Sequence, residues 1–285
     1  HLFIDLHEPE GLKKAQRLAN DADVIISNYR AGQGEKFGLD YASVCKDNPM
    51  VIYAQITGFG DNDSRAAFDV VLQAESGYMF MNGQPDSDPT KMPVALIDVL
   101  AAHQLKEGIL VALLAKVQKG KGALVAVSLL DAAISSLTNQ ATNWLMNGNL
   151  PQRMGSLHPN IAPYGEILTT SDGKQIVLAI GSEQHFRNLC EVLDLETLKE
   201  DARFISNHER VKHRSQLFQL INSKTKELSS AELMTNFAEV NVPAGMIKNM
   251  QEVFETKNSK EMLLRDTMTD GSEAIRVSQI AFYLE

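Results

Sequence analysis

The chain has 285 residues, of which 44 % are hydrophobic and 22 % are charged. These proportions are those of an ordinary globular protein, and they exclude a disordered chain, a collagen and a coiled coil. The net charge of −9 argues against general nucleic-acid binding, because that function needs clustered positive charge. The two cysteines, Cys45 and Cys190, supply neither a disulfide framework nor a zinc motif. No metal site is predicted, and both thiols are expected to be ordinary ones in a reducing compartment.

The first half of the chain alternates strand and helix signals. β-branched or strongly apolar runs bounded by turn residues are typical of buried parallel strands. The predicted strands span residues 2–6, 24–26, 50–56 and 124–128. The predicted helices include residues 69–80, 98–118 and 129–146. Strands separated by helical crossovers predict an α/β fold with a Rossmann-like, doubly wound parallel sheet.

The pattern changes near residue 148, where glycine and proline become frequent. Two apolar runs at 165–169 and 175–180 flank Asp172-Gly173, which predicts a β-hairpin. Helices are expected at 183–193, 207–227 and 230–240, and strands near 244–247 and 274–283. Because the length also predicts about two domains, we expect a large α/β domain over 1–148, a linker over 149–163 and a smaller α+β domain over 164–285.

The sequence shows no membrane-spanning or membrane-targeting pattern. No apolar run reaches the roughly 18–20 residues of a membrane span. The opening residues lack the pattern of a signal peptide, so a cytoplasmic location is expected. The first residue is His1 rather than Met, and it directly precedes a predicted strand, which suggests a fragment or a processed start.

Asp98 is the most informative single residue. It is the only ionisable group between Lys91 and His103, within a strongly apolar segment. A carboxylate is costly to bury without partners. One interpretation is that Asp98 caps the helix that begins there. The other is a nucleophile or general base at the start of a helix, and the two are compatible because capping keeps the carboxylate ionised.

Three further segments are candidates for a site. The glycine-rich turn over 28–38 follows a strand, where α/β folds bind ligands, but it matches neither the P-loop nor the dinucleotide fingerprint. Arg30 and Lys36 could contact phosphates there, or they could be solvated charges on an ordinary turn. His158 lies in the predicted linker and either lines a site or is a hydrogen-bonded structural residue. Asp69 is predicted to cap the helix that it begins.

Several short segments occur in a characteristic order along nearly the whole chain. They are Asp23 to Arg30, Asn48 to Tyr53, Ile56 to Gly60, Phe68-Asp69, Gly120-Lys121-Gly122, His158-Pro159-Asn160 and Val242 to Gly245. Taken together they resemble the class III CoA-transferases, the CaiB/BaiF group. The resemblance implies a fold of the interlocked-dimer CoA-transferase type, with a second copy of the chain as partner. It also implies coenzyme A as the co-substrate, with an acyl-CoA donor, a carboxylic acid acceptor and no metal.

The resemblance also implies roles for individual residues. Asp98 matches the catalytic carboxylate, which passes through an anhydride and an aspartyl-CoA thioester. The residues expected to contact coenzyme A are Asn28 and Lys36, with Arg30 and Arg65 by position. Phe68 is expected to line the pocket near the thioester, Gly181 to lie in a loop that closes over the acyl group, and His158 to lie near the site without being a catalyst.

Two alternatives follow from the same resemblance. An α-methylacyl-CoA racemase needs a His and an Asp to move a proton on both faces of the substrate. Its His directly precedes the Asp that matches Asp69, and this chain has Phe68 at that position. The other alternative is an inactive member that only binds coenzyme A. Members of the family extend beyond both ends of this chain, so segments preceding His1 and following Glu285 are expected to be missing.

Overall fold

The computed structural model describes residues 2–30 and 32–285. Within the predicted turn over 28–38, Ala31 lies outside the described residues. The chain divides into two compact units, His1–Gly155 and Ser156–Glu285. Over the described ranges, no helix is both long enough and apolar enough to cross a membrane. Both cysteines are free thiols.

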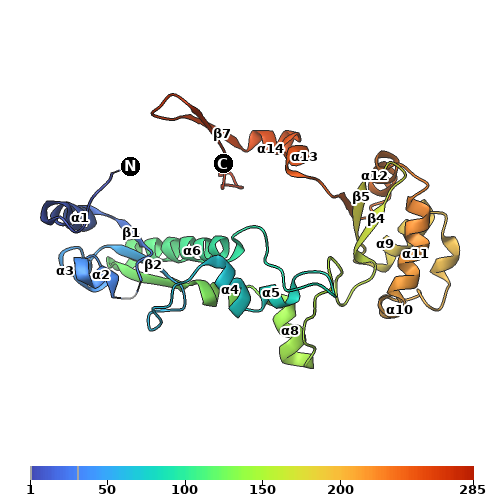
Figure 1. Ribbon diagram of the computed structural model, residues 1–285, viewed down its shortest axis with the longest axis horizontal. Helices are drawn as coiled ribbons and strands as arrows, with labels where there is room; N and C mark the ends of the chain where they lie inside the picture. Colours follow the sequence, from blue (N-terminus) through green and yellow to red (C-terminus); the bar gives the residue numbers. More distant parts are fainter. Residues whose placement is uncertain (1, 31) are drawn as a thin grey trace. The chain divides into compact units, whose positions relative to one another are not determined.

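A three-stranded parallel sheet organises the first unit (Figure 1). Its strands are β1 (Val24–Ser27), β2 (Ile52–Thr57) and β3 (Ala123–Ser128), in the order β1-β2-β3. The central strand is buried on both faces, since Ile52, Tyr53 and Ala54 are at most 1 % exposed. Such burial is the reason for its continuous apolar sequence. The predicted parallel sheet is therefore confirmed.

Helices cover both faces of this sheet. The helices of this unit are α1 (Pro9–Asp21), α2 (Gln33–Phe37), α3 (Tyr41–Asp47), α4 (Asp69–Glu75), α5 (Tyr78–Met81), α6 (Leu96–Lys119), α7 (Leu129–Ser135) and α8 (Thr138–Asn147). Successive side chains of a strand point to opposite faces. Tyr53 packs toward α1 and α3, whereas Ile56 packs toward α4, α6 and α7. Figure 1 shows α6 running along the strands, and it contacts both β2 and β3.

Three predictions for this unit are wrong. Residues 2–6 form no strand, and Phe3 is 97 % exposed, because β1 pairs only with β2 and offers that segment no partner among the described residues. The single helices predicted over 69–80 and 129–146 are each divided in two. Gly77 and Thr138 adopt left-handed backbone angles of +87° and +45° in φ, which a right-handed helix does not continue through.

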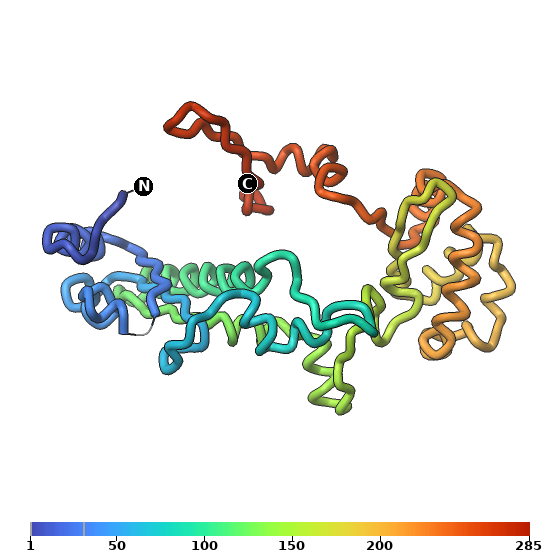
Figure 2. Tube along the Cα trace, in the orientation of Figure 1, coloured from blue at the N-terminus to red at the C-terminus, as the bar shows by residue number. Residues whose placement is uncertain are grey.

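An antiparallel sheet organises the second unit. Its strands are β4 (Tyr164–Thr169), β5 (Gln175–Ala179) and β6 (Ala244–Met246), in that order. The predicted hairpin around Asp172-Gly173 is confirmed, because β4 and β5 pair antiparallel across it. The helices are α9 (Glu183–Val192), the 3₁₀ helix η1 (Glu196–Lys199), α10 (Asn207–Lys212), α11 (Arg214–Thr225) and α12 (Ser230–Glu239). Figure 2 shows the hairpin trace in yellow with these helices beside it, and together they enclose one hydrophobic core.

The chain ends in small elements. They are α13 (Met250–Phe254), α14 (Lys257–Glu261), β7 (Leu263–Thr267) and β8 (Glu273–Val277), with β7 and β8 paired antiparallel. The last strand stops at Val277, short of the predicted 283, because β7 provides pairing only for residues 273–277. The helix predicted over 207–227 is divided between α10 and α11 at His213. The mixed α+β character expected of this second unit is confirmed.

Candidate active site

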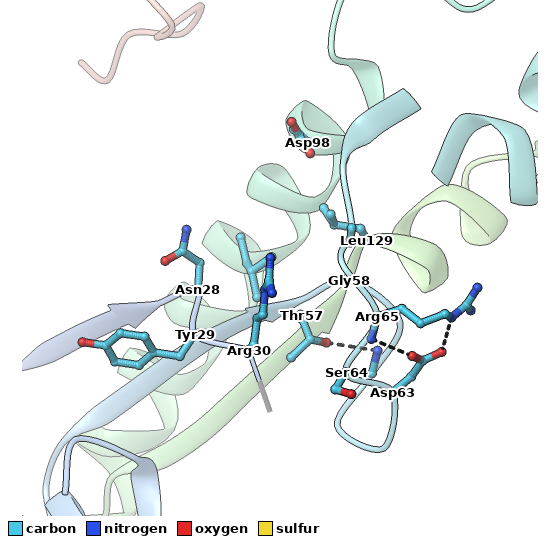
Figure 3. Close-up of a pocket in the computed structure, with 13 residues that line it drawn as sticks. Asn28, Tyr29, Arg30, Thr57, Gly58, Asp63, Ser64, Arg65, Asp98 and Leu129 are labelled. Atoms are coloured by element: carbon cyan, nitrogen blue, oxygen red, sulfur yellow. Dashed lines mark hydrogen bonds and ion pairs between the residues drawn. The ribbon is translucent and has the colours of Figure 1, made fainter. Parts of the chain in front are cut away.

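A pocket of about 370 Å³ lies at one edge of the parallel sheet. Residues at or just after the carboxyl end of each strand line this pocket (Figure 3). They are Asn28, Tyr29 and Arg30 after β1, Thr57 and Gly58 at the end of β2, and Leu129 after β3. The carboxyl ends of parallel strands meet at one edge, which is where α/β folds bind ligands. A crossover helix runs back from that edge, so the first turn of α6 also lies there. Topology thus brings Asp98 to residues that are 31 to 70 positions away in sequence.

Asp98 is the carboxylate of α6 that faces this pocket. It is the third residue of the helix and shows no hydrogen bond or ion pair to any other described residue (Figure 3). Desolvation by the surrounding protein raises the pKa of Asp98 above its usual 3.8, and the nearby charge of Asp69 raises it further. The positive end of the α6 dipole acts in the opposite direction. A carboxylate held with so few partners is a good base and nucleophile.

Two predicted helix caps are wrong. The helix that carries Asp98 begins two residues earlier, at Leu96, so Asp98 lies inside the first turn and cannot be its N-cap. Asp69 does not cap α4 either, because it is the first residue of that helix and Phe68 holds the N-cap position. Asp69 instead accepts a hydrogen bond of 2.7 Å from the backbone N–H of Ile97 in α6. Asp69 and Ile97 are 28 residues apart, and a hydrogen bond between residues so distant in the sequence leaves no local pattern in it.

Asn28 and Arg30 bring polar groups to the same pocket. Both are exposed, and both lie in the turn that follows β1. No carboxylate among the described residues pairs with the guanidinium of Arg30, so its charge is available to an anion entering from solvent. Guanidinium groups bind phosphate and carboxylate through paired N–H donors.

Arg65 also lines the pocket, but its charge is already paired. Its Nε lies 2.9 Å from Asp63 and its Nη1 lies 2.8 Å from Glu75. The guanidinium also stacks 3.8 Å from the centre of the Phe59 ring. Figure 3 shows Arg65 joined to Asp63. The sequence alone suggested Arg65 as an anion ligand and did not reveal its two carboxylate partners, because the three residues come together only through the loop between β2 and α4.

Two predicted site residues of the first unit do not line the pocket. Lys36 is exposed on the short helix α2, which begins after Gly32. Phe68 holds the N-cap position of α4 and its side chain is 69 % exposed, although its neighbour Ala67 does line the pocket. Their roles toward coenzyme A and the acyl group stay predictions.

The two predicted residues of the second unit lie in loops. The Nδ1 of His158 accepts a hydrogen bond of 3.1 Å from the backbone N–H of Asn160, and its ring packs against Tyr164. Partial burial, with a smaller contribution from the charge of Arg214, lowers the pKa of His158 below its usual 6.5. Gly181 lies between β5 and α9, with open space where a side chain would begin.

No cluster of three or more His, Cys, Asp or Glu side chains suited to a metal occurs in the part of the chain that the structure describes. The charged and amide side chains at the pocket are instead the exposed, unpaired carboxylate of Asp98, the unpaired guanidinium of Arg30, the amide of Asn28 and the ion pair of Asp63 with Arg65. This set suits a nucleophilic attack on a carbonyl carbon of an anionic ligand.

Solved structures with the same architecture come from bacteria. A CaiB/BaiF family protein of Brucella suis is 36 % identical and superimposes with a TM-score of 0.80, covering 98 % of this chain and 74 % of that one. A protein of Mycobacterium tuberculosis is 25 % identical with a TM-score of 0.85, covering 99 % of this chain and 74 % of that one.

Curated relatives carry the names of CoA-transferases. The succinate–glutarate CoA-transferase of Agrobacterium fabrum is 38 % identical over 256 residues, which are 89 % of this chain and 64 % of the relative. The human succinyl-CoA:glutarate CoA-transferase is 32 % identical over 89 % of this chain and 58 % of the relative. The chain thus spans about three fifths of these proteins. The family model for CoA-transferase family III matches residues 1–285, and with the shared fold and the carboxylate at the sheet edge this places the chain in that family.

Proposed function

We propose that this chain transfers coenzyme A from an acyl-CoA to a carboxylic acid, with Asp98 as the nucleophile. The observation that carries the proposal is the position of Asp98, a carboxylate without hydrogen-bond partners among the described residues, in a pocket that also holds the unpaired cation Arg30. Family membership supports the same reaction class.

The chemistry proceeds by acyl exchange at Asp98. Its carboxylate attacks the thioester carbonyl of the donor, and the CoA thiolate leaves to give a mixed anhydride. The thiolate then attacks the aspartyl carbonyl, which releases the donor carboxylate and forms an aspartyl-CoA thioester. The acceptor carboxylate attacks that thioester, which expels the CoA thiolate and forms a second mixed anhydride. The thiolate then attacks the acceptor acyl carbon of this anhydride, which forms the new acyl-CoA and releases the Asp98 carboxylate. Splitting one exchange into steps of similar energy removes the need for ATP.

Binding of coenzyme A is assigned to the turn after β1. Asn28 and Arg30 already face the pocket, and Lys36 lies further along the same turn and helix. Arg65 is a weaker phosphate ligand in this arrangement, because Asp63 and Glu75 share its charge. As the family resemblance implies, we propose that Phe68 lines the pocket near the thioester and that Gly181 lies in a loop that closes over the acyl group. His158 is proposed to lie near the site without being a catalyst.

A short dicarboxylate is the acid that we propose as substrate. The names of the relatives refer to succinate and glutarate, and that of a relative from Acetobacter aceti, 31 % identical, refers to oxalate. Each of these acids carries a second carboxylate.

We further propose that two copies of the chain assemble as an interlocked homodimer. Helix α6 exposes a row of apolar side chains, and Val117 among them is 88 % exposed. The other members are Leu110, Val111 and Leu114. Exposed apolar rows of this kind mark surfaces that a partner covers.

The proposal is tested by incubating the protein with a panel of acyl-CoAs and carboxylic acids and following products by mass spectrometry. We expect a new acyl-CoA whose formation depends on the acceptor acid. Replacement of the nucleophile in Asp98→Ala should lower the rate on the order of 10³-fold or more. Asp131, which the hydroxyl of Ser128 holds at the start of α7, supplies a matched control, and Asp131→Asn should retain transfer.

The same assay separates the alternatives. A racemase exchanges the α-proton of an acyl-CoA with solvent deuterium and needs no acceptor, whereas transfer leaves that proton in place. An inactive family member binds acyl-CoA without forming product. Full transfer activity in Asp98→Ala would contradict the assignment of the nucleophile.

A further inference from the structure

Helix α6, which carries Asp98, lacks a cap of its own. Ala95 occupies the N-cap position and has no side-chain acceptor to offer. The first turn of a helix leaves backbone N–H groups without partners inside the helix. Asp69 of α4 supplies an acceptor instead, because its Oδ1 lies 2.7 Å from the backbone nitrogen of Ile97. The residue that receives this bond directly precedes Asp98.

A buried glutamine fixes the second oxygen of Asp69. The side-chain amide of Gln73, which is fully buried, donates a hydrogen bond to Asp69 Oδ2. The Oε1 of Gln73 accepts a hydrogen bond of 2.7 Å from the backbone N–H of Met92, in the segment that leads into α6. One carboxylate oxygen of Asp69 is therefore bound by Gln73 of α4 and the other by the first turn of α6. Gln73 also binds the segment that precedes α6, through Met92.

The same contact lies over an apolar core. Leu72 of α4 and Ile97 and Ala101 of α6 are fully buried in one cluster. Packing sets the spacing of the two helices, and the hydrogen bond sets the rotation of the first turn of α6. A carboxylate three residues into a helix points where that turn directs it, so a small rotation changes its approach to a carbonyl carbon.

We propose that Asp69, oriented by Gln73, is a positioning residue that fixes the first turn of α6 and so aims the Asp98 carboxylate into the pocket. Its catalytic consequence rests on the proposed CoA transfer, whereas the fixing of the turn does not. A displacement of about 1 Å at a reacting group can lower a rate on the order of 10²-fold.

The negative charge of Asp69 also has a measurable effect on the pKa of Asp98. Among the described charged groups, Asp69 is the one whose field raises the pKa of Asp98, in addition to the desolvation caused by burial. Arg30 and Arg65 line the same pocket, the second with its charge shared by two carboxylates. Removing the charge of Asp69 while keeping an oxygen should therefore shift the titration of Asp98 to lower pH.

The test compares Asp69→Asn and Asp69→Ala with the unchanged protein in measurements that need no transfer activity. Nuclear magnetic resonance can follow hydrogen exchange of the Ile97 amide and the carboxyl titration of Asp98. We expect faster exchange at Ile97 in Asp69→Ala, and a lower pKa of Asp98 in both variants. Asp69→Asn keeps an acceptor for Ile97, so its exchange should lie between the other two.

Steady-state kinetics then measure the catalytic consequence. Asp69→Ala should lower kcat on the order of 10²-fold, with KM within about threefold, because the substrate contacts are intact. Asp69→Asn should recover part of that kcat, and the acidic limb of its pH–rate profile should move to lower pH. If the alanine variant does not fold, the asparagine variant still tests the proposal through the exchange of Ile97 and the titration of Asp98.

Asp172 provides the matched control. Its carboxylate also caps a helix from another element, since it accepts a hydrogen bond of 3.1 Å from the backbone N–H of Ser230 in α12. Asp172→Asn should lower the stability of the second unit and leave the kinetics and the Asp98 titration unchanged. The proposal would be overturned if the Asp69 variants kept the wild-type exchange rate at Ile97 and the wild-type titration of Asp98. It would also be overturned if Asp172→Asn lost as much kcat as the Asp69 variants. A wild-type protein without transfer activity would contradict the proposed function alone.

Discussion

The carboxylate of Asp98 is subject to opposing influences, and their balance decides its reactivity. The dipole of α6 favours the ionised form, while desolvation and the charge of Asp69 favour the protonated form and raise the pKa. A carboxylate with a raised pKa is more basic than one with the usual value of 3.8.

The pH dependence of transfer follows from this balance. In the proposed mechanism only the ionised form of Asp98 attacks, so kcat/KM should fall as pH drops through the pKa of Asp98 in the free enzyme. The acidic limb should therefore lie above pH 3.8, the usual value for this group. An acidic limb at or below pH 3.8 would contradict the raised pKa of Asp98.

Stability gives an independent check with a defined sign. A carboxyl group whose pKa is higher in the folded than in the unfolded protein lowers stability once it is ionised. Asp98→Asn should therefore be at least as stable as the wild type at pH 7 in urea unfolding. The difference should shrink as pH falls toward 3.8, and a destabilised Asp98→Asn at pH 7 would show that the charge has a stabilising partner.

The sequence revealed the site at the scale of single residues only in part. Asp98 stands out because no other ionisable residue occurs between Lys91 and His103. The roles of Asp69 and Gln73 left no such signal, since their partners Ile97 and Met92 lie 28 and 19 residues away. Contacts of that span are decided by how helices pack, which local spacing does not encode.

At the scale of elements, the turn between α6 and β3 shows how two nearby glycines serve different needs. Gly120 ends α6 in a left-handed conformation with φ of +63°, and open space surrounds the position of a Cβ. Gly122 needs no unusual φ, but a Cβ there would collide with the backbone of Met50 and Val51. The close approach allows Gly122 to donate a hydrogen bond of 3.0 Å to Pro49 and so begins the pairing of β3 with β2.

The two glycines should respond differently to alanine. Gly122→Ala should cost about 2–3 kcal/mol, because backbone atoms that cannot move aside must give way. Gly120→Ala should cost only about 1 kcal/mol, the penalty of a left-handed residue with a side chain. Urea unfolding of both variants measures the difference, and equal losses would contradict the close packing at Gly122.

Elements were predictable where their signals are local. The Asp172-Gly173 turn predicts its hairpin because a two-strand unit depends on its turn residues. The parallel strands were predictable from their apolar runs, which burial on both faces requires. The interruptions of helices at Gly77, Thr138 and His213 were missed, because apolar residues recur across them at nearly helical spacing.

At the scale of the whole molecule, the assembly of two copies is the least local of the proposals. The apolar row on α6 and the exposed side chains of α8 leave large hydrophobic surfaces facing solvent in a single chain. The members on α8 are Trp144, Leu145 and Met146. Burial of such surfaces against a second copy would gain roughly 25 cal/mol per Å² of apolar area.

Light scattering at micromolar concentration should therefore give twice the chain mass of 31.4 kDa. A charge in the apolar row, as in Val117→Glu, should shift the mass toward the single chain, because a buried unpaired carboxylate is costly. Gln118→Glu adds the same charge at the next exposed position and should leave the assembly intact. A mass of 31.4 kDa for the unchanged protein would contradict the homodimer.

The covalent intermediate on Asp98 tests the central claim most directly. The protein is incubated with succinyl-CoA in the absence of an acceptor acid, quenched, digested and analysed by mass spectrometry. We expect coenzyme A in thioester linkage on the peptide that contains Asp98, its loss on addition of glutarate, and its absence in Asp98→Ala. An adduct on another residue, or transfer of coenzyme A with Asp98 replaced, would contradict the account.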